Sequence, residues 1–409
     1  MPPNLLLYAH NSTGLGHLSR LLKIARALQA ELQDLSVLVL TASSAVNLLR
    51  LPPRADHIKL PALSWEGKGV YTSKNLPLAF EKVVRLRERI ILETALAYQP
   101  GLFLVDQRAR GVGGELLSTL RALRESQRHV PIVLGIRDFT DDAEVVRTVW
   151  QAEQVIPVLQ DLYDEIWVYG CQALYDPIKE YELPDTVARK VRFCGYLDVE
   201  PPGASPEETR RELGMVGQTF VLVTVGGGRD GYPVLDLFLR ALERFPRTLS
   251  ISSLLVGGPD LPSGDEKVLR QRCEQMTHPQ RSVRFIVSSP QFLDYMAAAD
   301  LVVSMGGYNT LIEALALEKR VVAIPRADLN PEQFIRASLF ERLGLIRMLH
   351  PDQLSPERTA EAIQAALDGP PPSRQRLLKV GLEMNGLDQV KAHVLRLLGE
   401  RGLLPQPSR

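Results

Sequence analysis

The stretch LVVSMGGYNTLIEAL, residues 301–315, places a short apolar run directly before two glycines and a segment of helical period. A run of this kind indicates a buried parallel strand, and the glycines allow the backbone to turn sharply into a helix. Short apolar runs, polar or glycine turns and helical segments alternate in this way along the whole chain. We therefore expect an α/β protein in which helices cover parallel sheets.

The first half of the chain contains the elements of one such sheet. Strands are expected at residues 5–8, 36–40, 102–105, 132–135 and 165–169. Helices are expected between them at residues 17–31, 76–98, 114–126 and 142–163. Residues 61–75 show no clear period, so we expect them to form a loop over a binding face.

The second half repeats this architecture after a linker. Strands are expected at residues 220–225, 252–256, 283–286, 301–304 and 321–324. A chain of 409 residues exceeds one ordinary core. The proline-rich stretch DVEPPGASP, residues 198–206, is the expected linker. Residues 1–197 and 207–372 would then be two Rossmann-like domains, and a helical segment at 373–409, broken near Gly386, is expected to pack back on the first.

The composition limits the partners of the protein. Lys plus Arg and Asp plus Glu both number 48, so no global field attracts nucleic acid. One basic run on the expected helix 76–98 is interpreted as a solvated face, so that membrane contact is peripheral at most: Lys82, Arg85, Arg87 and Arg89. The three cysteines lack CxxC spacing, which argues against disulfides and zinc. Without a recognisable signal peptide or span, a cytoplasmic location is expected.

The glycine turn after the strand 301–304 has the features of a diphosphate site. The two glycines open the backbone, and the first amides of the following helix lack intrahelical acceptors. Asn309 or Thr310 is expected to cap this helix, and Glu313 could accept both hydroxyls of a ribose. The candidate residues are Ser304, Gly306, Gly307, Asn309, Thr310 and Glu313. A capped, buried helix with a surface glutamate would show the same pattern.

Two further strand ends of the second half carry polar or glycine-rich residues. In VTVGGGRDGY, residues 223–232, the amides of Gly226, Gly227 and Gly228 could point at an anion, and Arg229 could neutralise a phosphate. A plain strand-to-helix turn is the alternative. In IPRADLNPEQF, residues 324–334, Glu332 and Gln333 could hold sugar hydroxyls, although an acidic residue there is also good capping.

The first half offers a histidine and an aspartate. HNSTGLGHLSR, residues 10–20, follows the first expected strand, and Gly14 and Gly16 allow a tight turn with close approach to a ligand. His17 would lie in the opening turn of a helix, whose dipole favours the neutral imidazole that can accept a proton. A glycine turn with a histidine cap is the alternative. Asp106 ends another strand and could line an interdomain cleft or cap a loop.

Together these segments resemble the GT-B glycosyltransferases, particularly the bacterial group that adds N-acetylglucosamine to the lipid-linked peptidoglycan precursor, and its uncharacterised relatives. The resembling motifs are GLGHLSR, RDFTDDAEVV with YDEIWVYG, and GGYNTLIEAL followed by EQF. The resemblance implies two Rossmann-like domains facing across a cleft, with Glu313 on the ribose and Glu332 and Gln333 on the sugar. Met305 stands where many transferases of small molecules carry histidine, so phosphate contacts would depend on backbone amides and Arg229.

The expected enzyme is a hexosyltransferase that uses a nucleoside-diphosphate sugar, with UDP as the expected nucleotide. His17, or Asp106 if His17 only positions, would remove the acceptor's proton in an inverting displacement that needs no metal and no cofactor. The acceptor, whether a glycan, a lipid-linked molecule or a small molecule, is not indicated. A nucleotide-sugar hydrolase or 2-epimerase on the same fold, and a non-catalytic nucleotide-sugar-binding protein, are the alternatives.

Overall fold

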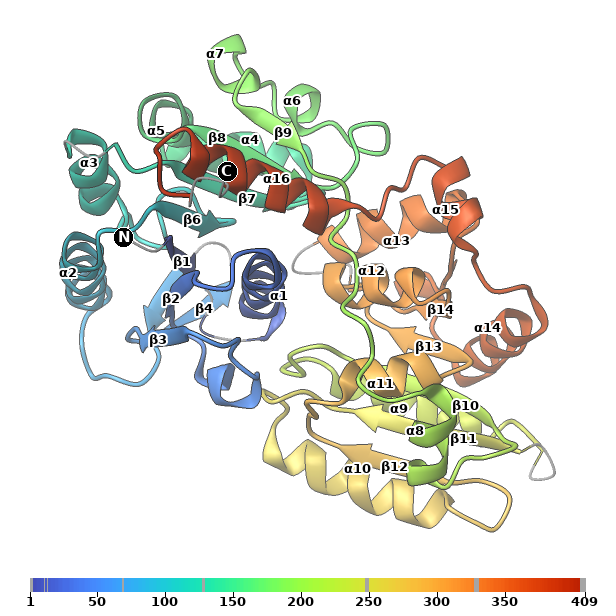
Figure 1. Ribbon diagram of the computed structural model, residues 1–409. Helices are drawn as coiled ribbons and strands as arrows, with labels where there is room; N and C mark the ends of the chain where they lie inside the picture. Colours follow the sequence, from blue (N-terminus) through green and yellow to red (C-terminus); the bar gives the residue numbers. More distant parts are fainter. Residues whose placement is uncertain are drawn as a thin grey trace. The chain divides into compact units, whose positions relative to one another are not determined.

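The computed structural model describes residues 3–10, 12, 14–67, 70–126, 129–246, 250–326 and 331–404. The chain forms two compact units, the first of Met1–Leu197 with Leu382–Arg409 and the second of Asp198–Gly381 (Figure 1). Each unit contains its own parallel sheet, with helices packed on it. The expected α/β class with two Rossmann-like sheets is confirmed.

The sheet of the first unit has the strand order β3-β2-β1-β6-β7-β8-β9, with all neighbours parallel. Its strands are β1 (Asn4–Ala9), β2 (Ser36–Thr41), β3 (Ala55–Lys59), β6 (Leu102–Asp106), β7 (Ile132–Arg137), β8 (Glu165–Tyr169) and β9 (Val191–Phe193). The order reverses between β1 and β6, where Ala9 pairs with Asp106 at the carboxyl ends. Such a reversal is the usual ligand site of an open α/β sheet.

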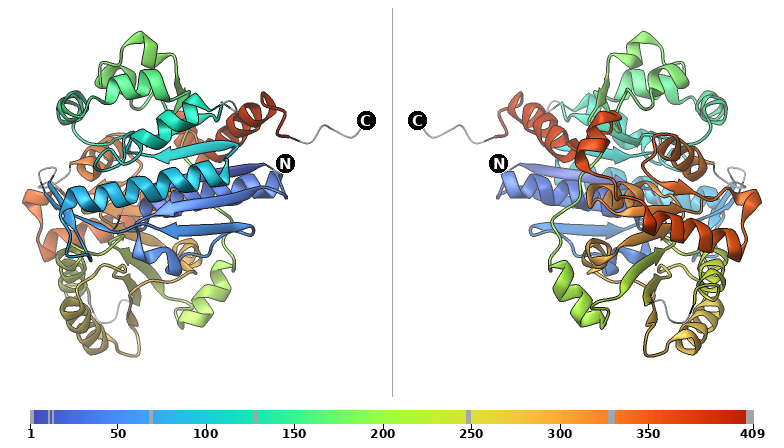
Figure 2. Two further views of the ribbon diagram at one scale, coloured as in Figure 1. Left: turned by 90° about the vertical axis from the view of Figure 1, so that its left-hand side faces the viewer. Right: turned by 90° about the vertical axis from the view of Figure 1, so that its right-hand side faces the viewer.

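Helices cover both faces of this sheet. α2 (Phe80–Tyr98), α3 (Leu117–Glu125) and α5 (Val155–Leu162) share one core with alternate strand residues such as Leu6 and Phe103. α1 (Gly16–Glu31) and α16 (Gly386–Gly399) contact each other on the opposite face, where His393 of α16 stacks on Trp167. Figure 2 shows α16, in red, beside the strands of this unit. The remaining helices of this unit are η1 (Ser44–Leu48), α4 (Ala143–Ala152), α6 (Pro177–Glu180) and α7 (Asp185–Ala188).

The sheet of the second unit has the order β12-β11-β10-β13-β14-β15. Its strands are β10 (Thr219–Thr224), β11 (Ile251–Val256), β12 (Val283–Ile286), β13 (Leu301–Ser304), β14 (Arg320–Ala323) and β15 (Arg347–Met348). Its helices are α8 (Pro206–Leu213), α9 (Tyr232–Leu242), α10 (Ser263–Met276), α11 (Phe292–Ala298), α12 (Tyr308–Ala316), α13 (Glu332–Arg342), η2 (Pro351–Gln353), α14 (Pro356–Asp368) and α15 (Arg374–Lys379). The order reverses between β10 and β13, where Thr224 pairs with Ser304. The glycine turns after these two strands therefore start side by side.

The expected loop at residues 61–75 is wrong, because this segment contains an antiparallel hairpin. Strands β4 (Leu63–Gly67) and β5 (Val70–Ser73) pair with Trp65 opposite Tyr71. The register shifts between Trp65 and Gly67, and such a bulge removes the period of two by which a strand is recognised.

Two expected helices are interrupted. The helix expected at 142–163 is α4 and α5, separated at Gln154, which adopts a left-handed φ of 53°. Pro157 lacks an amide hydrogen and cannot continue the ladder of α4. The C-terminal segment is likewise two helices, α15 and α16, and the expected break near Gly386 is confirmed, because it runs from Val380 to Asn385. Within the described ranges, none of the helices combines the length and apolar character needed to cross a bilayer.

The basic run on α2 is not wholly solvated, because Arg87 is completely buried. Its Nη2 lies 2.8 Å from Glu115 Oε1, and Tyr8 donates a hydrogen bond of 2.8 Å to the same oxygen. Arg87 Nη1 also donates to the Pro61 carbonyl, 2.8 Å away. A buried charge needs such partners, so this arginine ties α2 to the segment that leads into the hairpin.

Candidate functional site

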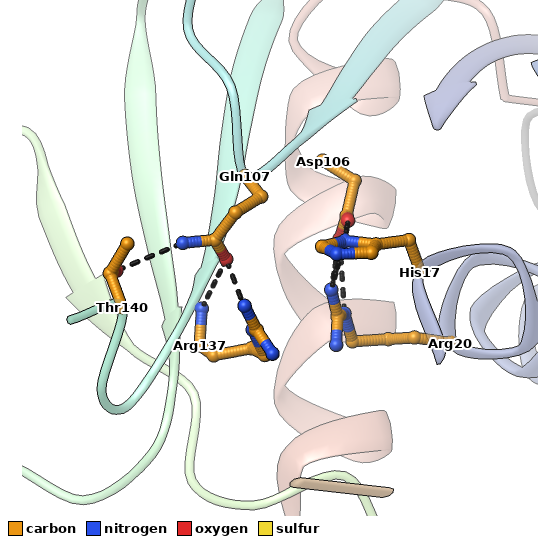
Figure 3. A network of polar contacts seen from close by, with 6 residues as sticks. All are labelled: His17, Arg20, Asp106, Gln107, Arg137 and Thr140. Carbon is orange, nitrogen blue, oxygen red and sulfur yellow. Dashed lines mark hydrogen bonds and ion pairs between the residues drawn. The ribbon is translucent and has the colours of Figure 1, made fainter. Parts of the chain in front are cut away.

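The strand-order reversal of the first unit brings together two of the candidate residues. Asp106 is the last residue of β6, and its side chain lies on the face covered by α1. His17 lies in the first turn of α1, and its Nδ1 contacts Asp106 Oδ2 (Figure 3). Asp106 is fully buried, whereas the His17 side chain is 17% exposed. The alternative of a histidine cap is wrong, because Leu15 occupies the N-cap position.

This contact defines which nitrogen of His17 can accept a proton. Arg20 Nη2 also lies 3.1 Å from Nδ1, but Asp106 Oδ2 makes the closer contact. Because a carboxylate only accepts hydrogen bonds, Nδ1 carries the hydrogen and Nε2 holds the lone pair. Burial lowers the pKa of His17 from its ordinary value, and Asp106 acts in the opposite direction. Burial alone would raise the pKa of the Asp106 carboxyl, but Arg20 and His17 bring it well below its usual range. The pair is therefore a neutral imidazole beside a carboxylate.

Arg20 completes this arrangement, although its role was not predicted from the sequence. Its Nη2 lies 2.8 Å from each oxygen of Asp106, and its Nε lies 3.0 Å from Oδ1. The side chain is 2% exposed and lies over the Tyr169 ring at 5.7 Å. The signal that could have found it is its position three residues after His17, which places both side chains on one helix face.

A metal ion is a possible alternative use of these residues. Ligand atoms of His10, His17 and Asp106 lie within 4.8 Å of one another, and two imidazoles with a carboxylate suit zinc. Both Asp106 oxygens, however, already accept hydrogen bonds from Arg20, and a neighbouring guanidinium repels a cation. The residues therefore fit a histidine–aspartate pair better than a metal site.

Glycines determine the backbone of two loops: the first loop, between β1 and α1, and the triple-glycine loop, which contains Gly226–Gly228 between β10 and α9. Gly14 adopts a φ of +73°, and a Cβ there would meet no described atom within 4 Å; Gly16 is the first residue of α1. Gly228 has a φ of +91°, and a Cβ there would lie 1.9 Å from the Gly257 carbonyl oxygen. Close packing against Gly257 thus explains why residue 228 is a glycine. A Cβ on Gly226, at φ +64°, would meet open space, so only the backbone conformation explains that glycine. Asn11 and Thr13 lie outside the described residues.

The start of α12 differs from the expected cap. Gly307 is the N-cap residue and has no side chain with which to cap the helix, and Asn309 and Thr310 lie inside the first turn. Gly306 precedes it with a φ of +78°. Glu313 is 6% exposed, which excludes the alternative of a surface glutamate. The first-turn amides of α12 therefore depend on groups other than a capping side chain.

Arginines connect the loops at the carboxyl edge of this sheet. Arg336 is fully buried; it donates to Glu332 Oε1 at 2.8 Å and to the Gly306 carbonyl at 3.4 Å. Arg326 donates its backbone amide to Gln333 Oε1 at 3.3 Å. The structure thus brings the glycine turn before α12 next to Glu332 and Gln333, and sequence reasoning missed both arginines. Residues 327–330 of this expected loop lie outside the described residues.

Arg326 also reaches the triple-glycine loop, since its Nη1 lies 2.6 Å from Asp230 Oδ2. Asp230 follows Arg229, the arginine expected to neutralise a phosphate. The loops after β10, β13 and β14 are therefore joined within one unit.

Parts of this chain are similar in sequence to known proteins. Residues 262–378 match the glycosyltransferase family 28 C-terminal domain. An uncharacterized glycosyltransferase of Methanopyrus kandleri is 26% identical over 190 residues, 46% of this chain and 50% of that protein. The UDP-N-acetylglucosamine--N-acetylmuramyl-(pentapeptide) pyrophosphoryl-undecaprenol N-acetylglucosamine transferase of Thermoanaerobacter is 26% identical over 165 residues, 40% of this chain and 44% of that one. The chain thus spans about half the length of these relatives.

Solved structures show the same fold over nearly the whole chain. MurG of Acinetobacter baumannii has a TM-score of 0.56 at 13% identity, covering 98% of this chain and 100% of that one. A ugt transferase from Siraitia grosvenorii in complex with UDP has a TM-score of 0.60 at 17% identity, covering 97% and 99%. The protein therefore has the GT-B fold, and its residues 262–378 are similar in sequence to the glycosyltransferase family 28 C-terminal domain.

Proposed function

We propose that the protein is a glycosyltransferase that moves a hexosyl group from a nucleoside-diphosphate sugar, with UDP as the nucleotide, to an acceptor hydroxyl. The observation that carries this proposal is the His17–Asp106 pair at the strand-order reversal of the first unit. A neutral imidazole oriented by a buried carboxylate is suited to remove a proton from a hydroxyl near neutral pH.

In this mechanism the second unit binds the donor. The backbone amides of Gly226, Gly227 and Gly228 and of the first turn of α12 stabilise the charge that develops on the departing diphosphate. Glu313 accepts the ribose hydroxyls. Glu332 and Gln333 contact the sugar, and Arg336 fixes Glu332 in position through their hydrogen bond. The amides supply the stabilisation for which other transferases use a metal ion.

The first unit supplies the base. As the acceptor oxygen attacks the anomeric carbon, the bond from that carbon to the diphosphate oxygen breaks and the hydroxyl proton moves to His17 Nε2. The configuration at the anomeric carbon inverts in this single displacement. Asp106 stabilises the imidazolium that forms, because its carboxylate accepts the Nδ1 hydrogen.

Removal of the base tests the proposal. Release of UDP from UDP-sugars, with pools of glycan, lipid-linked and phenolic acceptors, should fall by ~100-fold or more in His17→Gln. His57→Gln, on β3 of the same unit, is the matched control and should keep the wild-type rate. A near-normal rate in His17→Gln would remove this residue as the base. Free sugar released without an acceptor would identify a hydrolase, and an isomerised donor an epimerase.

A further inference from the structure

We propose that Arg20 is a positioning residue that balances the charge of Asp106, so that His17 remains neutral at rest. The proposal rests on the function assigned above to His17. Arg20 and His17 project from the same face of α1 onto one buried carboxylate, as Figure 3 shows. Arg20 does not act on substrate; it acts on His17 through Asp106 and through its own charge, since its Nη2 lies 3.1 Å from His17 Nδ1.

The geometry makes Arg20 the main partner of Asp106. The carboxylate receives three contacts of 2.8 to 3.0 Å from the guanidinium, and only one from the imidazole. The guanidinium donates hydrogen bonds to both carboxylate oxygens. Such bidentate pairing holds the plane of a carboxylate and stabilises its negative charge. The orientation of Asp106 toward Nδ1 is therefore set by Arg20.

The net charge of Arg20, Asp106 and His17 determines whether His17 is protonated. With Arg20 present, the guanidinium and carboxylate together carry no net charge, and protonation of His17 would add one positive charge to a largely buried site. Without Arg20, the carboxylate is alone, and protonation of His17 would restore neutrality. Buried sites favour the neutral combination. Loss of Arg20 should therefore turn the resting imidazole into an imidazolium, which cannot accept a proton.

Other charged groups near His17 do not replace Arg20. His10, after β1, lies edge-on to His17 with ring centroids 4.4 Å apart. Arg137, at the end of β7, lowers the pKa of His17, but its Nε is directed at Gln107 Oε1 (Figure 3). Arg108 lowers the pKa of His10, whose largest cause of lowering is burial. Among these groups, Arg20 is the one that pairs with Asp106 in the described part of the chain.

The titration of His17 itself measures this effect. Selective 13C labelling of the seven histidines allows each ring to be followed by NMR, and His17→Gln identifies the signal of His17. Arg20→Gln keeps a hydrogen-bond donor and removes the charge, whereas Arg20→Lys keeps the charge and removes the fork. We expect His17 to titrate at higher pH in Arg20→Gln and near the wild-type pH in Arg20→Lys.

Asp106→Asn provides an independent test in which the His17 titration should shift in the opposite direction, because the positive charge of Arg20 then has no carboxylate beside it. His17 should then titrate at lower pH than in the wild type. Arg87→Met is the matched control: it also removes a fully buried arginine paired with a carboxylate, but on the other face of the sheet. The His17 titration should not change in this variant.

The outcomes separate this inference from the proposed function. The inference is overturned if Arg20→Gln and Arg20→Lys, both folded by circular dichroism, shift His17 alike or not at all. If neither folds, an Asp106→Asn titration at or above the wild-type pH overturns it instead. NMR needs no turnover, so a wild-type protein without transferase activity would refute the function and leave this test intact. In an active enzyme, the acid limb of kcat/KM should move to higher pH in Arg20→Gln.

Discussion

Gly307→Ala probes whether a diphosphate binds at the amino end of α12. Gly307 has φ −64° and ψ 147°, which any residue adopts, and a Cβ there would meet no described atom within 4 Å. The substitution therefore adds a methyl group that neither strains the backbone nor collides with the described protein. Its effect on stability should stay within about 1 kcal/mol, the usual range for an N-cap change to alanine.

The expected effect on binding is larger than the effect on stability. If phosphate oxygens approach the backbone at Gly307, the methyl group displaces at least one charge-assisted hydrogen bond, worth about 1.5–3 kcal/mol. This loss corresponds to a rise of roughly 10- to 150-fold in the Kd for UDP. Isothermal titration calorimetry with UDP measures it directly.

Gly264→Ala is the matched control for this measurement. Gly264 lies in the first turn of α10, in the same unit, and a Cβ there also meets no described atom within 4 Å. Its UDP affinity should equal that of the wild type. An unchanged Kd in Gly307→Ala, with UDP binding intact in both proteins, would refute a diphosphate site at α12.

The remaining predictions concern packing, charge and metal. Gly228→Ala should destabilise the protein by about 2 kcal/mol or more in urea unfolding, because the new Cβ would overlap the Gly257 carbonyl at a positive φ; wild-type stability would contradict the packing. Arg87→Met should cost roughly 3–5 kcal/mol by leaving the buried Glu115 carboxylate without a counter-charge, and an unfolding midpoint equal to that of the wild type would contradict this. Turnover needs neutral His17, and burial lowers the pKa of this residue. As the pH decreases, kcat/KM should therefore fall only below the pH range in which an ordinary imidazole titrates. A fall of kcat/KM that begins above that range would contradict the lowered pKa. EDTA should leave turnover unchanged, whereas loss restored by zinc would favour the metal alternative.

The fold could be predicted because its signals are local. Apolar runs identified the central strands, and the glycine turns located the strand ends at which the candidate residues gather. Short polar edge strands such as β3 and β15 lack these signals, since their residues are only partly buried. The bulge at Trp65 and the missing amide of Pro157 are single-residue effects that a periodicity average does not resolve.

The partners within the site could not be predicted in the same way. Asp106 lies 86 positions from Arg20, and the two meet only because β6 is placed next to β1 in the sheet. Arg326 and Asp230 are 96 positions apart and meet across two loops. The chemistry of a strand end can thus be read from local residue types, but the ion pairs that orient it depend on strand order.

The stereochemistry of the product tests the central claim most directly. Wild-type protein, a UDP-α-hexose and the acceptor pool should give a β-linked glycoside and one UDP per transfer, as followed by NMR of the anomeric proton, and His17→Gln should give almost none. Retention at the anomeric carbon would contradict the single displacement. No glycoside with any UDP-sugar, from protein that binds UDP, would contradict the transferase itself.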